Sequence, residues 1–148
     1  MITHRSKYAL KALMFLAAPE REGSVMADAI AEANNIPRSF LQTILSDMSK
    51  LGFIRSKRGP RGGFVLSRPA QDIAVREVLR KLDGPIFPLA CVDPNAVNCC
   101  PDCRSLQACR VRLGMLRVNE AAMAALDGMT VGDMALMGSD PAAAEVTV

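Results

Sequence analysis

Five cysteines lie within nineteen residues of this chain and are the side chains best suited to chemistry: Cys91, Cys99, Cys100, Cys103 and Cys109. Thiolates are soft, charged donors that bind zinc and iron–sulfur clusters in tetrahedral sulfur sites. The spacing Cys100-x2-Cys103 is typical of a metal knuckle, in which one loop supplies two ligands. An odd, tightly clustered set is unlike the disulfide framework of a secreted domain. The segment therefore predicts a metal or redox-active thiol site.

Three alternatives to a metal remain open for these thiols. Cys109 can be a core residue of a helix, Cys100 and Cys103 can form a redox dithiol, and the segment can bind nothing. A dithiol enzyme usually places its pair at the start of a helix that follows a strand. Four prolines instead make this segment a loop: Pro85, Pro88, Pro94 and Pro101. With no paired carboxylates and no Ser/His/Asp arrangement, the sequence favours a protein that is not an enzyme.

The charge of the chain is divided unevenly between its two halves. Residues 1–68 carry a net charge of +6 and residues 69–148 a net charge of −3. A basic half is typical of contact with a polyanion. The 148 residues and 50% apolar content are enough for one globular core. Uncharged runs of at most nine residues exclude a membrane span, and the helical spacing of apolar residues 10–17 argues against an export signal.

Two helices joined by a short turn are predicted within residues 24–52. The first has an N-cap at Ser24 and an apolar side formed by Met26, Ala27, Ile30 and Ala31. Residues 34–35 provide the turn, and Pro37 suits the first turn of the second helix. The second helix ends at Gly52 and carries an apolar stripe of five residues: Leu41, Ile44, Leu45, Met48 and Leu51.

The opposite face of that second helix carries short hydrogen-bonding side chains and one cation: Ser39, Gln42, Thr43, Ser46 and Lys50. Ser, Thr and Gln can donate to or accept from base edges in the major groove. Two helices in this arrangement match the helix-turn-helix pattern of DNA-binding proteins, although a solvated helix face would look the same. Arg38, at the start of the helix, is a further candidate DNA contact.

Residues 53–56 and 63–67 are predicted strands on either side of a glycine-rich tip. Residues 55–68 contain no acid and five cations: Arg55, Lys57, Arg58, Arg61 and Arg68. Glycines let a backbone approach phosphates, and arginines neutralise them or enter a narrow minor groove. Directly after a helix-turn-helix, such a hairpin predicts the wing of a winged helix rather than an edge hairpin kept soluble by its charge.

A short helix is predicted over residues 73–82, and a long helix from about residue 104 to residue 126. The long helix has one apolar stripe at Leu106, Cys109, Leu113 and Leu116, and a second at Val111, Met115, Val118, Ala122 and Ala125. A helix that is apolar on two faces must be covered twice. We expect the same helix of a second copy to supply one cover, which would pair two recognition helices on a palindromic site. The alternative is that the long helix packs only against the helix expected around residues 10–17 of its own chain.

Four stretches of the chain resemble the bacterial winged-helix regulators of the Rrf2 family, which includes the iron–sulfur cluster regulator IscR and the nitric-oxide-sensitive repressor NsrR. These are residues 6–13, 36–45, 51–54 and, most specifically, 58–66 with the sequence RGPRGGFVL. The resemblance covers residues 1–136 and implies a cytoplasmic homodimer that binds palindromic double-stranded promoter DNA. It further implies these DNA contacts: base readers Ser39, Gln42 and Thr43, wing-tip residues Arg58, Gly59, Pro60 and Arg61, and backbone contacts Lys7 and Tyr8.

The same resemblance implies an iron–sulfur cluster held by three cysteines ahead of the long helix. The family pattern has a first gap and a second gap between its three cysteines. The pair Cys103 and Cys109 fits the second gap, and Cys91 with Cys99 or Cys100 fits the first, but no set of three cysteines fits both. The histidine that follows the last cysteine in IscR-like members is replaced by Arg112, and the single histidine, His4, lies near the N-terminus. A fourth ligand would be another cysteine or a residue of the partner subunit. Zinc or a metal-free thiol sensor are the alternatives to a cluster.

The predicted fold class is mainly α with a small β-hairpin wing, a winged helix-turn-helix domain followed by a long C-terminal dimerisation helix. Residues 1–83 form the DNA-binding domain and residues 84–103 the cysteine-rich sensor loop. Residues 104–136 form the dimerisation helices, and residues 137–148 a disordered tail. Promoter binding by such a protein would be modulated by the state of the Cys91–Cys109 segment.

Overall fold

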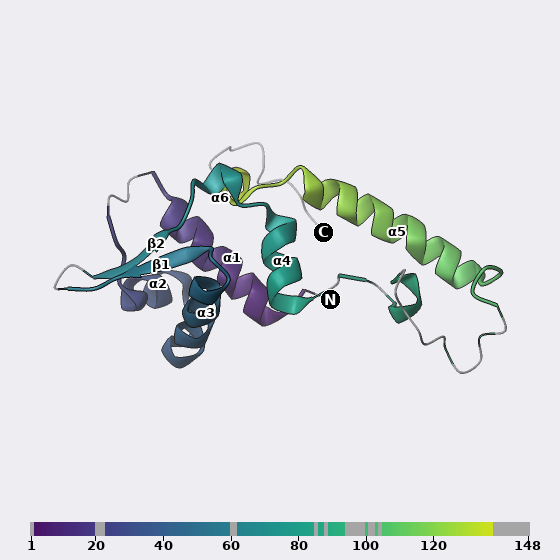
Figure 1. Cartoon of the computed structure of the whole chain (residues 1–148), viewed down its shortest axis with the longest axis horizontal. Helices are drawn as coiled ribbons and strands as arrows, with labels where there is room; N and C mark the ends of the chain where they lie inside the picture. Colours follow the sequence, from purple (N-terminus) through teal and green to yellow (C-terminus); the bar gives the residue numbers. More distant parts are fainter. Residues whose placement is uncertain are drawn as a thin grey trace.

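The computed structural model describes residues 2–19, 23–59, 62–84, 86–87, 89–93, 100, 103 and 105–137. The elements follow in this order: α1 (His4–Ala17), α2 (Ala27–Asn34), α3 (Arg38–Lys50), β1 (Ile54–Lys57), β2 (Gly63–Leu66), η1 (Ala70–Asp72), α4 (Val75–Asp83), η2 (Ala90–Val92), α5 (Arg110–Asp127) and α6 (Val131–Leu136). Helices α1–α4, the hairpin and α6 form one body, and α5 projects from it on the side away from the hairpin (Figure 1). The predicted class, mainly helical with a two-stranded hairpin, is confirmed.

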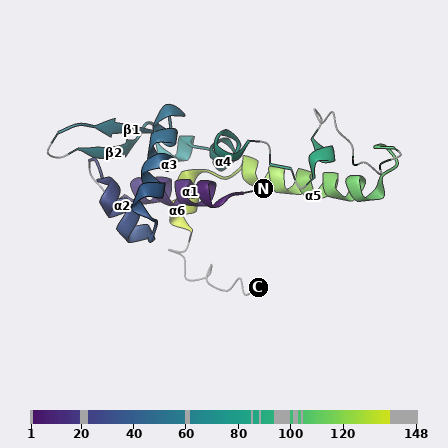
Figure 2. The same cartoon turned by 90° about the horizontal axis from the view of Figure 1, so that it is seen from below.

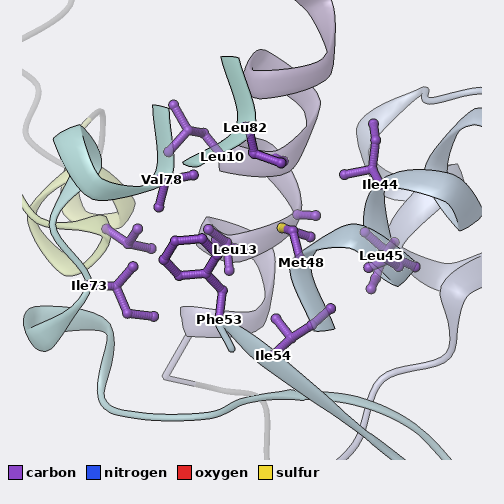
Figure 3. Packing of buried hydrophobic residues seen from close by; sticks show 14 of the residues in the cluster. Leu10, Leu13, Ile44, Leu45, Met48, Phe53, Ile54, Ile73, Val78 and Leu82 are labelled. Carbon is purple, nitrogen blue, oxygen red and sulfur yellow. The ribbon is translucent and has the colours of Figure 1, made fainter. Parts of the chain in front are cut away.

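A single hydrophobic core joins the helices of this body to the base of the hairpin. Phe53, which is fully buried, lies among Leu13 of α1, Met48 of α3 and Val78 of α4 (Figure 3). Burying a phenylalanine side chain stabilises a fold by about 1.5–3 kcal/mol. Because Phe53 directly precedes β1, the orientation of the hairpin is set by the packing of three helices.

The turn between α2 and α3 has the predicted left-handed residue. Asn35 has a φ of 50° and a ψ of 51°, and its N–H donates to the carbonyl of Glu32. Asparagine tolerates this conformation better than most residues with a side chain. Gly52, with a φ of 80°, ends α3 in the predicted way, and the N–H of Phe53 returns to the carbonyl of Met48. The turn of the helix-turn-helix motif and the end of its second helix therefore follow local sequence signals.

The start of α2 differs from the prediction. The N-cap expected at Ser24 is wrong, because α2 begins at Ala27 and its N-cap residue is Met26, which makes no side-chain cap bond. Met26, expected on the apolar side, is 62% exposed. The cause is a bridge between distant residues: Val25 and Phe64 exchange two backbone hydrogen bonds of 3.0 and 2.8 Å. This bridge holds the chain extended where the helix was expected to start.

The hairpin is antiparallel, with Ile54 opposite Leu66 and Lys57 opposite Gly63. A glycine is required at position 63, where φ is +149° and a Cβ would lie 2.4 Å from the Val25 carbonyl oxygen. The hairpin is thus tied to the segment before α2 by an approach that no other residue permits.

The long helix begins at Arg110 and not at about residue 104. Its first helical hydrogen bond runs from the N–H of Leu113 to the carbonyl of Cys109. Before it, the Ser105 hydroxyl oxygen accepts from the N–H of Ala108, and such a side-chain turn competes with helix formation. Leu106 therefore lies in this turn and not on the predicted helical stripe.

Helix α6 completes the core of the winged body. Val131 is fully buried, its N–H donates to the carbonyl of Ile73, and the helix packs against α1. Thr130 and Asp133 form a reciprocal capping box at its start. We expected this helix among the dimerisation helices, and within its own chain it packs against α1. Residues 138–148, most of the predicted disordered tail, lie outside the described residues.

Candidate functional site

The predicted base-reading face of α3 lies in solvent. Ser39, Gln42 and Thr43 are exposed, as are Ser46 and Lys50. On the other side, four residues of the apolar stripe are buried in the core and the fifth, Leu51, is half-buried. The Thr43 hydroxyl donates to the Ser39 carbonyl over 3.4 Å, which is long for such a bond, so the hydroxyl can exchange it for a base edge. The amphipathic spacing thus leaves a hydroxyl- and amide-rich surface that the described part of the chain does not cover.

Arg38, the first residue of α3, forms an ion pair with Asp28 of α2. Both side chains are largely exposed, and ion pairs in such positions contribute at most about 1 kcal/mol. The guanidinium can therefore leave Asp28 for a DNA phosphate at small cost. The pair links the two helices of the motif. Arg38 was predicted only as a DNA contact, so this structural role was not expected.

Two residues predicted to contact the DNA backbone lie on α1. Lys7 is exposed, whereas Tyr8 is half-buried. The Tyr8 ring packs edge-on against Phe40 of α3, with 5.8 Å between the ring centroids, and His4 packs edge-on against Tyr8 at 6.0 Å. Tyr8 consequently positions the start of α3.

The described part of the wing tip is exposed and cationic. Arg58 and Gly59 are exposed, Gly59 has a φ of +113°, and the N–H of Gly62 donates to the Gly59 carbonyl over 2.8 Å. The predicted contacts Pro60 and Arg61 lie outside the described residues. Seen from below, the hairpin extends beyond α2 and α3 at the end of the molecule opposite α5 (Figure 2). Its tip can therefore reach a duplex that α3 contacts.

The base of the wing is held to α4 by ion pairs that the sequence alone did not indicate. Arg68, two residues after β2, pairs with Glu77 of α4, and Lys81 pairs with the same carboxylate at 2.8 Å. Hydrogen bonding from Lys81, with the nearby Arg68 charge, holds the pKa of Glu77 below its ordinary value against the effect of burial. Both cations also lie over the Phe53 ring, 5.7 and 5.1 Å from its centroid.

Four of the five predicted metal ligands line one open cavity of about 440 Å³, which we call the cysteine cavity: Cys91, Cys100, Cys103 and Cys109. Cys91 is buried in η2, and Cys109 is the residue that precedes α5. The N–H of Cys103 donates to the Cys100 carbonyl over 2.9 Å, which is the tight turn expected of the x2 spacing. Cys99 lies outside the described residues. The fold thus gathers thiols from both ends of the segment.

The donor set fits a thiolate-bound group, and its arrangement is open. Within the described ranges, no three candidate ligands lie close enough together to hold one metal ion. A zinc site needs sulfurs about 3.8 Å apart, because its Zn–S bonds of about 2.3 Å point to the corners of a tetrahedron. The thiolates of a four-iron cluster, one on each iron, stand further apart, whereas two thiolates on the same iron of a two-iron cluster lie about as close as those of a zinc site. The described thiols can therefore supply ligands to a single ion or to a cluster.

Helix α5 is uncovered along most of its length. None of residues 110–127, all of them described, is buried. Its half-buried side faces α4 and η2, whereas Val111, Leu113 and Val118 are 65%, 47% and 52% exposed. Ala122 and Ala125, which continue the stripe of Val111 and Val118, are also exposed. In the described part of the chain, no helix is both long and apolar enough to cross a membrane.

Comparisons with known proteins agree with this architecture. The family model Rrf2, described as an iron-dependent transcriptional regulator, matches residues 2–136. An rrf2-like HTH-type transcriptional regulator of Rhodobacter capsulatus is 40% identical over 146 residues, which are 97% of each chain. The structure of CymR, the global cysteine regulator of B. subtilis, matches with a TM-score of 0.74 and 27% identity, covering 91% of this chain and 95% of that one. T. potens IscR matches with a TM-score of 0.71 and 25% identity, over 96% of this chain and 90% of that one.

Proposed function

This chain belongs to the Rrf2 family of transcriptional regulators, and from that premise we propose that it is a homodimer whose promoter binding depends on the contents of the cysteine cavity. As in other helix-turn-helix regulators, its target is DNA. The observation that carries the proposal is the meeting of four thiols at the start of the uncovered helix α5. A ligand at that place can act on both the thiols and the dimer helix.

Recognition of DNA would be divided between α3 and the wing. The exposed side chains Ser39, Gln42 and Thr43 would read base edges in the major groove. Arg58 and the glycine beside it would approach the minor groove, and Lys7 and Arg38 would hold phosphates. One such unit contacts only a few base pairs, so specificity requires two units on a palindromic site.

The uncovered face of α5 supports the dimer. Its exposed residues Val111, Val118, Ala122 and Ala125 form one stripe with Gly114 between them. Exposed apolar stripes of this length mark interfaces, and small side chains let two helices approach closely. Two copies joined along α5 would carry their wings at the outer ends of the dimer, because the hairpin and α5 lie at opposite ends of the molecule (Figures 1 and 2).

An iron–sulfur cluster is the proposed occupant of the cysteine cavity, with zinc or a metal-free thiol sensor as the alternatives. Cys91 and Cys109 would bind it from the two walls of the cavity, and Cys99, Cys100 or Cys103 from the turn between them. A bound cluster supplies a centre that oxygen, nitric oxide or iron shortage can alter. The thiols of this chain would hold it, and η2 and α5 would be ordered around it.

The signal would reach the DNA-binding half along α5. Its first turn borders the cysteine cavity, and Asp127 in its last turn pairs with Arg76 of α4. Loss of the occupant would loosen η2 from α5 and change how two copies of α5 pack. The spacing of the two recognition helices would change with it, and such coupling is typically worth about 1–3 kcal/mol.

Anaerobic purification of the full chain tests the proposal. A visible iron–sulfur absorption with matching iron and acid-labile sulfide supports the cluster, whereas colourless protein with stoichiometric zinc replaces it by zinc. Fluorescence anisotropy at fixed salt then compares promoter affinity with the occupant present and removed. Equal affinity in both states would rule out the sensing role, and no DNA binding in either state would rule out the regulator itself.

A further inference from the structure

Arg112, which stands where IscR-like members carry a histidine, lies in the wall of the cysteine cavity. It lies in the first turn of α5, lines the cavity and is half-buried. Its Nε donates a hydrogen bond of 2.8 Å to the backbone carbonyl of Cys91, 21 residues earlier in the chain. This bond joins the wall that carries Cys91 to the wall that begins at Cys109.

No described side chain that lines the cavity carries a negative charge to balance that of Arg112. The remaining described lining residues are apolar, thiol or hydroxyl side chains, with no carboxylate among them: Leu89, Cys91, Cys100, Cys103, Ser105, Leu106, Ala108, Cys109 and Val111. A guanidinium stays protonated in proteins, and partial burial makes its charge costly unless an anion lies nearby. Neutral thiols supply no such charge, whereas thiolates bound to a metal do.

We propose that Arg112 is a positioning residue that selects an anionic metal–thiolate group for this cavity. The proposal rests on the metal-dependent function above and adds the chemistry of the occupant and a residue that acts on it. Arg112 would hold Cys91 in place before binding, so that less ordering is needed when the group enters. Its positive charge would stabilise the bound thiolates and, for a cluster, the reduced state that carries one more electron.

Four forms of the full chain test this role: wild type, Arg112→Met, Arg112→Lys and the control Arg110→Met. Arg110 begins the same helix and is exposed, and it is absent from the described lining of the cavity. Anaerobic titration with Co²⁺, followed by its thiolate charge-transfer absorption, measures metal affinity. Reconstitution with ferrous iron and sulfide, followed by redox titration, measures the midpoint potential of the cluster.

We expect Arg112→Met to weaken Co²⁺ affinity at least tenfold, the usual size of an effect from a residue that supports metal ligands. The midpoint potential should become more negative, because an added electron loses a nearby positive charge. Arg110→Met should change both quantities little, and Arg112→Lys should return the potential towards the wild-type value because it keeps the charge.

Equal Co²⁺ affinity and potential in Arg112→Met and Arg110→Met would overturn the inference and leave the proposed function intact. A wild-type protein that takes up neither Co²⁺ nor a cluster would overturn the proposed function, and the inference with it. Far-UV circular dichroism confirms that each variant is folded. If Arg112→Met does not fold, the comparison of Arg112→Lys with wild type decides, because a potential shifted by the lysine would contradict the role of charge.

Discussion

Arg5 Nη2 lies 2.6 Å from Asp47 Oδ2, and this ion pair joins the first turn of α1 to the recognition helix α3. The same guanidinium donates through Nη1 to the Leu82 carbonyl at the end of α4, over 3.3 Å. One side chain therefore contacts three helices, and the third of them leads directly into the cysteine segment. The position of α3 thus depends on the residue that also holds the end of α4.

Replacing Arg5 by glutamine should lower the free energy of unfolding by about 1 kcal/mol, because Arg5 is 41% exposed and water screens part of the interaction. Urea unfolding of Arg5→Gln, Asp47→Asn and the double variant measures the coupling between the two residues. We expect the effects to be non-additive by about 0.5 kcal/mol or more, as they are for residues in contact. Strictly additive losses would show that the pair contributes no stability.

Arg58→Ala should weaken binding to every operator sequence and reduce the slope of log K against log salt by about 1, because one phosphate contact is lost. Fluorescence anisotropy over a range of salt concentrations gives the slope. Arg117→Ala is the matched control, since Arg117 is an exposed cation on α5. A slope that changes equally in both variants would argue against the wing contact.

Gln42→Ala should relax the choice of base at one position of each half-site. An amide that bonds two groups of one base discriminates by about 1–3 kcal/mol, and its loss should level affinities across substitutions at that position. A panel of single-base-pair operator variants measures this effect. Lys7→Ala provides the contrast, because loss of a phosphate contact should weaken all operators alike. Uniform weakening by Gln42→Ala would remove the residue from base readout.

Val118→Glu should convert the protein from a dimer to a monomer in sedimentation equilibrium. Val118 is 52% exposed on the apolar stripe of α5, and a carboxylate at a buried interface is left without a partner. Ala124→Glu adds the same charge to another exposed face of the helix and should leave the dimer intact. A Val118→Glu protein that still sediments as a dimer would place the interface elsewhere.

The contribution of Asp83 to stability should disappear in acid. Its carboxylate accepts from the N–H and the hydroxyl of Thr3, at 2.9 and 2.7 Å. Burial acts to raise the pKa of Asp83, but its two hydrogen bonds from Thr3, together with the nearby Ser6 side chain, outweigh it, so the pKa lies below its ordinary value. A lowered pKa means stability that is complete above the ordinary value, near pH 4, and is lost as pH falls through the lowered value.

Urea midpoints of wild type and Asp83→Asn at pH 7, 5, 3 and 2 measure this contribution. We expect wild type to be the more stable protein at pH 7 and 5, and the difference to become smaller at pH 3 and smaller again at pH 2, as the carboxylate is protonated. A difference that is unchanged at pH 2 would show that the ionised carboxylate is not its source.

Local signals in the sequence were sufficient where one element's own residues decide its structure. The apolar stripe of α3 and the left-handed residues Asn35 and Gly52 were predicted correctly, because helical periodicity and turn chemistry act within a few residues. The hairpin strands were predicted within one residue at each end for the same reason.

Local signals failed where a partner distant in sequence decides the conformation. Ser24 looks like an N-cap until Val25 pairs with Phe64 of the hairpin. The start of α5 was placed six residues early, because Ser105 competes for the backbone that a periodic pattern assigns to the helix.

By itself, the sequence determined a winged helix-turn-helix with a hydroxyl-rich face, a cationic hairpin and a thiol-rich segment, since residue type and spacing specify each of these. Only the tertiary structure decided that Arg5 contacts α3 and α4 and that thiols twelve or more residues apart share a cavity. The same holds for the hydrogen bond from Arg112 to the Cys91 carbonyl in that cavity. Contacts of this kind depend on how whole helices pack, and packing is settled by the core as a unit rather than by neighbours along the chain.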